Sequence, residues 1–180
     1  MEQIFSQYHV PLVRQRMTKD DGFETEEEAR SFGNNACGAA CVKMALEAFG
    51  KTDVPSVKKL MEEGIRSGFY EEPAGWIHKG LIRLAERHGA TARRLDIKKH
   101  PLELGNYLKK GGLIIASVSL GFNPERRGGH LVVVHGIESE ENKLKKVHFR
   151  DPSAFGQLHS DIDGESFLNS WTGNIVVVYE

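Results

Sequence analysis

The segment "ACGAACVKMALEAF", residues 36–49, limits the possible folds more than any other part of the chain. Its spacing predicts a helix that Gly50 ends. Small and apolar side chains occupy nearly the whole circumference of this helix, and its two charged residues, Lys43 and Glu47, lie one turn apart on a narrow stripe. A helix with so little polar surface must be buried on almost every side. We therefore expect a central helix around which the rest of the chain packs.

Both cysteines of the chain belong to this helix, and their positions predict different roles. Cys37 falls in the first turn, where Asn34 or Asn35 is expected to cap the helix and where free backbone N–H groups and the helix dipole stabilise an anion. That place favours a thiolate, and therefore a nucleophile. Cys41 lies one turn deeper on an apolar face and is expected to be a small packing residue. A disulfide between them is geometrically awkward, and the scattered histidines do not supply a metal site, so we expect no metal and no cofactor.

The rest of the chain shows helical patterns in its first half and strand patterns in its second. Helices are expected at residues 55–66, 76–89, 101–110 and 164–171, with a short one inside the acidic stretch 17–32. Strands are expected at residues 9–13, 91–97, 113–120, 130–137, 143–150 and 174–180, and a loop at 68–75. This segregation predicts an α+β fold with an antiparallel sheet rather than alternating βαβ units. A chain of 180 residues without repeats or an evident linker suits a single domain spanning residues 1–180.

Composition excludes several kinds of partner. Lysine and arginine total 24 and aspartate and glutamate 25, so the charge balance gives no reason to expect a nucleic acid or a membrane surface. No apolar run approaches the ~20 residues that a membrane span needs. The start of the chain, "MEQIFSQYHVPLVRQ", lacks the layout of a signal peptide, so cytoplasmic is the default expectation, and secretion stays open.

A hairpin pattern in "GGHLVVVHGIESEENKLKKVHFRDPS" brings a histidine near an aspartate. If the turn is centred between Glu140 and Glu141, His130 lies opposite Asp151 at the open end of the two strands. Their face continues with valines and phenylalanine and is expected to be buried. The other face, which carries His135, is mixed and is expected to be solvated. A buried histidine–aspartate pair is the base and orienting acid that a thiol nucleophile needs.

Taken together, "NNACGAACVKMAL", "GGHLVVVHGI" and "RDPS" resemble the papain-like bacteriocin-processing cysteine peptidases, family thirty-nine, and most closely their stand-alone relatives without a transporter. The resemblance spans nearly the whole chain in the same order. It implies a papain-like fold, with the central helix packed on a C-terminal antiparallel sheet. In that family a glutamine follows a "VP" segment near the N-terminus and donates to the oxyanion, and "VPLVRQ" offers Gln15 at this place.

The resemblance implies Cys37 as nucleophile, His130 as base, Asp151 as orienting acid and Gln15 as oxyanion donor, together with the Cys37 backbone N–H. The gap between Gln15 and Cys37 is longer than in transporter-linked members, so Asn34 or Asn35 stays open as the alternative donor. The predicted function is a thiol hydrolase that cleaves a peptide or isopeptide bond in a peptide or protein substrate. A thiol acyltransferase that uses the same residues, or a catalytically silent binding module, is the alternative.

Overall fold

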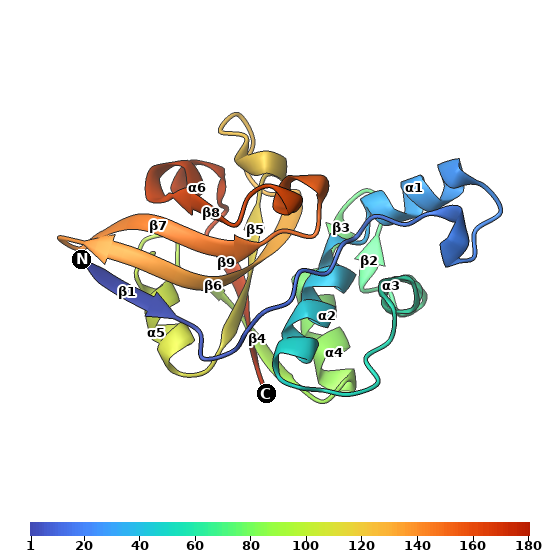
Figure 1. The fold of residues 1–180 in the computed structure, drawn as a ribbon, viewed down its shortest axis with the longest axis horizontal. Helices are drawn as coiled ribbons and strands as arrows, with labels where there is room; N and C mark the ends of the chain where they lie inside the picture. The colour runs from blue at the N-terminus through green and yellow to red at the C-terminus, as the bar shows by residue number, and fades with distance from the viewer.

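The computed structural model describes residues 1–180 and has the expected α+β architecture. The helices are α1 (Glu26–Asn34), α2 (Cys37–Ala48), α3 (Val57–Arg66), α4 (His78–Arg87), α5 (Glu103–Lys109) and α6 (Gly164–Ser170), with short 3-10 turns η1 (Lys19–Asp21), η2 (Leu120–Phe122) and η3 (Ala154–Gln157). The strands are β1 (Glu2–Phe5), β2 (Tyr70–Glu71), β3 (Gly75–Trp76), β4 (Thr91–Asp96), β5 (Leu113–Val118), β6 (His130–Glu140), β7 (Lys143–Arg150), β8 (Asp161–Asp163) and β9 (Asn174–Tyr179). Figure 1 shows α1 to α4 gathered on one side and most of the sheet on the other.

Helix α2 is the buried central helix that the sequence predicted. Its side chains from Cys41 to Leu46 are fully buried apart from Lys43. Lys43 satisfies its charge through Glu47, at 2.9 Å between Nζ and Oε1, and also donates to two backbone carbonyls of the segment before α3. The predicted asparagine cap is wrong. Ala36 occupies the N-cap position without a side-chain bond, because Asn34 is already the last residue of α1.

Seven strands form one antiparallel sheet, in the order β4-β9-β5-β6-β7-β8 with β1 pairing beside β6. Alternate side chains of β5, β6 and β9 enter two separate hydrophobic cores. One core lies between the sheet and α2, α3 and α4, and the other lies between the sheet and α5 and α6. The central strands are therefore covered on both faces, and α2 is held against them from one side.

The hairpin of β6 and β7 forms, but with a different register from the predicted one. Glu141 and Asn142 make the turn, with φ of 51° and 60°, the conformation of a two-residue hairpin turn. Val134 consequently pairs with Phe149 rather than with Val147. A shift of two residues preserves the alternation of the faces, so the apolar face remains buried. Two bulges interrupt the ladder.

The expected solvated face of this hairpin is also wrong near its open end. Leu131 and Val133 are 6% and 0% exposed because they pack into the core that contains α2. Their neighbours Val132 and Val134 fill the other core. The sequence pattern of the two strands had suggested that one face of the hairpin is solvated. Helices cover both faces of this sheet, so a strand in its middle carries apolar side chains on both faces.

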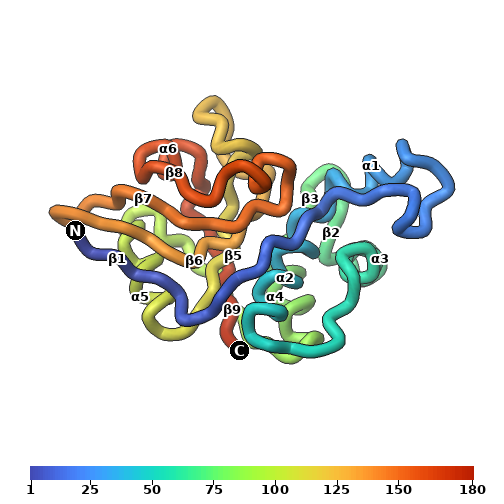
Figure 2. Tube along the Cα trace, in the orientation of Figure 1, coloured from blue at the N-terminus to red at the C-terminus, as the bar shows by residue number.

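Residues 9–13 form no strand, contrary to the prediction, and cross instead from the sheet to the helices. Figure 2 shows this N-terminal stretch running past β6 towards α1. The Nε of Arg150 donates to the Val10 carbonyl at 3.0 Å, and the Gln15 N–H donates to the Pro152 carbonyl at 2.9 Å. The crossing segment therefore bonds to the end of β7 rather than to a sheet edge. Strands β1 and β8, and the small β2–β3 hairpin of residues 70–76, were not predicted. No helix has the length and apolar character needed to cross a membrane.

Candidate active site

Cys37 is the first residue of α2, and its surroundings suit an anion. No backbone bond uses the N–H of Cys37, because Ala36 is the N-cap and the first bond at this end runs from Ala40 to Ala36. Its side chain is nearly buried, with 8% of the residue exposed. The chain enters α2 directly from α1, so no side chain competes for the free N–H groups. The sulfur therefore lies beside unpaired backbone donors at the positive end of a helix.

His130 and Asp151 meet at the end of the sheet, where β6 begins and β7 has just ended. The His130 Nε2 lies 2.7 Å from the Asp151 Oδ1, and the two residues are only 5% and 1% exposed. The Ser153 N–H donates to the same carboxylate oxygen at 2.8 Å. Asp151 cannot donate when ionised, so Nε2 carries the proton of this bond. The other ring nitrogen, Nδ1, is left for a second partner.

Gly156 fixes the turn that follows Asp151. A Cβ at this glycine would overlap the Asp151 carbonyl oxygen, so a side chain here would push the turn away from the carboxylate. The motif "DPSAFG" therefore closes tightly over the acid. This glycine was not singled out in the sequence, and its role depends on a close approach that no spacing pattern indicates.

The contact between His130 and Asp151 shifts the pKa of both side chains. Burial alone would lower the pKa of His130, but the hydrogen bond to Asp151 and the nearby Cys37 outweigh it and raise this pKa to about 9. Burial acts in the opposite sense on Asp151, and the bonds from His130 and Ser153 nevertheless hold the pKa of that carboxyl below its usual range. The buried imidazole is therefore charged near neutral pH, with a carboxylate as its partner.

Cys41 is the buried packing residue that the sequence predicted. Cys41 is 0% exposed, and burial, together with nearby Cys37 and Asp151, raises the pKa of its thiol well above the usual value. The Cys41 thiol stays neutral and packs among apolar neighbours in the core that lies between α2 and the sheet. Neither cysteine forms a disulfide. No group of three or more histidine, cysteine, aspartate or glutamate side chains is arranged to hold a metal ion.

Gln15 also reaches this site, from the crossing N-terminal segment. It is 8% exposed, and its Nε2 donates to the carbonyls of Gly33 at 3.1 Å and Asn34 at 3.2 Å. Its Oε1 is buried without a partner. The approach is close because Gly33 has no side chain, since a Cβ there would lie 2.9 Å from the Gln15 carbonyl oxygen. The alternative donors are less buried: Asn34 is exposed, and the Asn35 amide donates to the Ser31 carbonyl at 3.4 Å.

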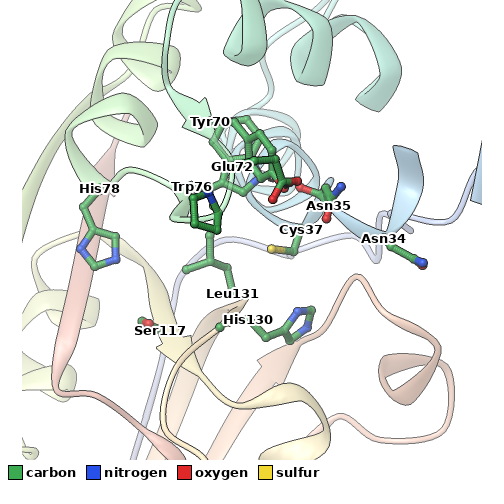
Figure 3. Close-up of a pocket in the computed structure, with 13 residues that line it drawn as sticks. Asn34, Asn35, Cys37, Tyr70, Glu72, Trp76, His78, Ser117, His130 and Leu131 are labelled. Carbon is green, nitrogen blue, oxygen red and sulfur yellow. Dashed lines mark hydrogen bonds between the residues drawn. The ribbon is translucent and has the colours of Figure 1, made fainter. Parts of the chain in front are cut away.

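Two cavities meet at Cys37 and His130. The smaller, of about 250 Å³, lies under the β2–β3 hairpin and includes Tyr70, Glu72 and Trp76 among its lining residues (Figure 3). The larger, of about 990 Å³, extends the other way, past Gln15 and along the segment after Asp151. Figure 3 shows Cys37 and His130 facing the smaller cavity from different elements, α2 and the start of β6. A chain laid through both cavities would pass directly over the sulfur.

Trp76 is part of the wall of the site. A Cβ at Gly38 would lie 2.5 Å from its ring and one at Gly64 2.6 Å from it, so the indole packs between α2 and α3 on two glycines. Its Nε1 donates to the Asn35 carbonyl at 2.8 Å. Gly38, which follows Cys37, is thus where the Trp76 ring contacts α2. This contact explains why a glycine stands next to Cys37 in the "CG" pair.

Comparison with known proteins agrees with the observed fold. The Peptidase_C39 like family matches residues 7–174. The peptidase domain of Streptococcus ComA, a bi-functional ABC transporter involved in quorum sensing, is 17% identical, with a TM-score of 0.61 over 96% of this chain and 100% of that one. A double glycine motif protease from an AMS/PCAT transporter, solved with its leader peptide, is 22% identical, with a TM-score of 0.58 over 99% of this chain and 98% of that one. No curated protein sequence matches the chain.

The fold and the family match define a cysteine peptidase-like hydrolase. The chain belongs to the Peptidase_C39 like family, which matches nearly its whole length.

Proposed function

We propose that this protein cleaves a peptide or isopeptide bond through Cys37, His130 and Asp151, by way of an acyl-enzyme. The observation that carries the proposal is the buried bond of 2.7 Å between His130 and Asp151, at a cavity that Cys37 lines. Asp151 holds the imidazole with its Nε2 proton pointing to the carboxylate, which leaves Nδ1 for the thiol. The pKa of His130, raised to about 9, favours transfer of the thiol proton to the imidazole. The resulting resting state is a thiolate beside an imidazolium.

Bond cleavage follows from this ion pair. The Cys37 thiolate attacks the substrate carbonyl carbon and forms a tetrahedral intermediate, whose oxyanion accepts from the free Cys37 N–H. The carbon–nitrogen bond then breaks as the imidazolium of His130 gives its Nδ1 proton to the leaving amine. The acyl group remains on the sulfur as a thioester. His130, now neutral, takes a proton from a water molecule that attacks the thioester, and the thiolate leaves with release of a carboxylic acid.

Gln15 supplies the second donor to the oxyanion. Its Nε2 carries two hydrogens, and both are engaged by carbonyls in the free protein. The Gly33 carbonyl also accepts from the Ala36 N–H at 3.1 Å, so it keeps a partner if the Gln15 hydrogen turns to the oxyanion. The exchange therefore leaves neither the Gln15 hydrogen nor the Gly33 carbonyl without a partner. The proposed donor pair is therefore the Gln15 amide and the Cys37 N–H.

The pH dependence of alkylation tests the proposal without a known substrate. Iodoacetamide should modify Cys37 rapidly well below pH 7, because the thiolate is already formed beside the imidazolium. In His130→Ala the reaction should require a higher pH. Mass spectrometry of the modified peptide separates Cys37 from the buried Cys41. If Cys37 in the intact fold reacts like an ordinary thiol, and His130→Ala leaves its profile unchanged, the protein is a binding module and the proposed function fails.

A further inference from the structure

The two cavities beside Cys37 carry opposite charges. The larger cavity is lined by Arg14, Arg16 and Arg30, and its lining contains no aspartate or glutamate. The smaller cavity has Glu72 in its lining and no lysine or arginine. The whole chain is nearly neutral, with a formal net charge of −1, so this separation is local. Charges of one sign gathered along a cleft select substrates of the other sign.

The three arginines of the larger cavity lack acidic partners within the chain. None of them forms an ion pair within 4.0 Å, although cations elsewhere do, such as Lys43 with Glu47. With the Gln157 amide turned so that its oxygen faces Arg14, that oxygen accepts from the guanidinium at 2.6 and 3.3 Å. This neutral contact orients the guanidinium but leaves its charge uncompensated. Carboxylates are the natural partners of such groups, because a guanidinium binds them through two parallel hydrogen bonds.

The rim of the same cavity is apolar. Leu120 and Leu158 are 63% and 85% exposed although they line it, and they are the most exposed leucines of the chain. Phe155 lies beside them, with its ring stacked on His159 at 4.0 Å between centroids. Exposed apolar side chains around unpaired cations suit a chain segment that carries both apolar groups and carboxylates.

We propose that the substrate segment lying in the larger cavity is acidic, so that the enzyme selects peptides with carboxylates on one side of the cleaved bond. The inference rests on the proposed function, because it assigns this cavity to the substrate of Cys37. Arg14, Arg16 and Arg30 are the specificity-determining residues. Either aspartate and glutamate side chains or the terminal carboxylate of a short leaving peptide supply the negative charge. Arg126 and Arg127 are exposed on the loop before His130 and do not line the cavity.

Cleavage of a synthetic peptide library provides the test. One half of the library has amidated C-termini and the other half has free ones, and the position of every cut is determined by mass spectrometry. We expect aspartate and glutamate to be enriched on one side of the cut only. Enrichment in the amidated half identifies side chains as the source of charge, and enrichment confined to the free half identifies the terminal carboxylate. Equal use of acidic and neutral residues on both sides overturns the proposal.

A triple variant links the preference to the arginines. Replacing Arg14, Arg16 and Arg30 by glutamine should lower kcat/KM for the best acidic peptide roughly tenfold, as expected for three exposed charge contacts. The loss should be smaller for the analogue with glutamine in place of its acidic residues, so that the preference for the acidic peptide falls. The matched control replaces Arg66, Lys99 and Lys145 by glutamine, which changes the net charge equally but alters residues that line neither of the two cavities. Equal losses in the two variants would assign the effect to overall charge and overturn the proposal.

Alkylation separates this inference from the proposed function if no library peptide is cut. The ratio of the Cys37 reaction rates with iodoacetate and with iodoacetamide reports the potential at the sulfur, since the reagents differ mainly in charge. The arginine variant should lower this ratio about fivefold at low salt, and the control variant should leave it unchanged. A ratio unaffected by the arginines overturns the acidic-substrate proposal even where Cys37 shows the low-pH reactivity of the proposed enzyme.

Discussion

The N-terminus of α2 and the open end of the β6–β7 hairpin contribute to the same site in different ways. The helix end presents the sulfur of Cys37 and an unpaired backbone N–H, both of which depend on a few consecutive residues. The hairpin end presents His130 and Asp151, which are far apart in sequence and are joined by one side-chain bond. The first region is organised by local helix geometry, and the second by strand pairing. We therefore expect the first to govern whether a thiolate can attack, and the second to govern where the protons go.

Loss of the sulfur has the largest expected effect. Cys37→Ala should reduce peptide cleavage by roughly 10⁴-fold or more, because no other thiol lines the two cavities. The melting temperature should change little, since Cys37 lies at the cavity surface. Measuring cleavage and thermal unfolding in parallel checks this. Substantial cleavage by a folded Cys37→Ala protein would mean that the helix end does not carry the nucleophile.

Loss of the orienting acid comes next. Asp151→Ala should lower kcat/KM roughly 10³-fold, because His130 loses the partner that fixes its tautomer and stabilises its charge. Asp151→Asn is the matched variant: its amide oxygen still accepts from Nε2, so a smaller loss is expected. Without the carboxylate charge the pKa of His130 falls, and the activity of Asp151→Asn should decline at a lower pH than in the wild type. If both variants lose the same factor in kcat/KM and keep the wild-type pH profile, Asp151 contributes through packing and not through its charge.

Removing the proposed oxyanion donor should cost about 10²-fold in kcat with little change in KM. The variant is Gln15→Ala, compared with Asn34→Ala. Gln15 is buried beside Cys37, whereas Asn34 is exposed, so only the first should slow the reaction. Steady-state kinetics on one peptide distinguishes the two. If Asn34→Ala is the slow variant, the donor comes from the end of α1 and the Gln15 amide serves to hold the Gly33 and Asn34 carbonyls.

The pH dependence of cleavage by the wild type tests the contribution of His130 and Asp151 separately from that of the helix end. Because the pKa of His130 is raised to about 9, the imidazolium that protonates the leaving amine persists to that pH. Cleavage should then fall about tenfold for each further pH unit. The folded-state pKa lies above the unfolded value, so the stability from this pair is complete below about pH 6.5 and is lost as the pH rises through 9. Alkylation of Cys37 should not fall with cleavage, because it needs only the thiolate.

The same contrast explains what the sequence could predict. The central helix, the places of Cys37 at its start and of Cys41 in the core, and the α+β class follow from local composition and periodicity, and the structure has them. The hairpin register was wrong by two residues because the turn depends on Glu141 and Asn142 adopting positive φ, which a run of polar residues does not specify. His130 and Asp151 were nevertheless correctly predicted to lie close together, because a register shift of two residues leaves each side chain on the same face of the sheet.

Other features of the site could not be found by pattern at all. Trp76 and Gly156 act through close contacts between segments distant in sequence. The arginines of the larger cavity come from the crossing N-terminal segment, read as a strand up to Val13, and from α1, and only the fold shows that they gather beside one sulfur. Local chemistry was therefore accessible from the sequence, whereas the substrate-facing walls depend on the tertiary arrangement. The roles of Gln15, Cys37, His130 and Asp151 stay predictions that the variants above test.

The smallest expected effect comes from the second cysteine of the same helix. Cys41→Ala removes one sulfur from a fully packed position and should cost roughly 1 kcal/mol of unfolding free energy. Catalysis should change less than about threefold, because the Cys41 thiol is buried and neutral, with its pKa raised by burial. Denaturant unfolding and peptide cleavage measure the two quantities separately. A folded Cys41→Ala protein without activity would show that the reactive sulfur lies one turn deeper, and the division between a reactive helix end and an inert helix interior would fail.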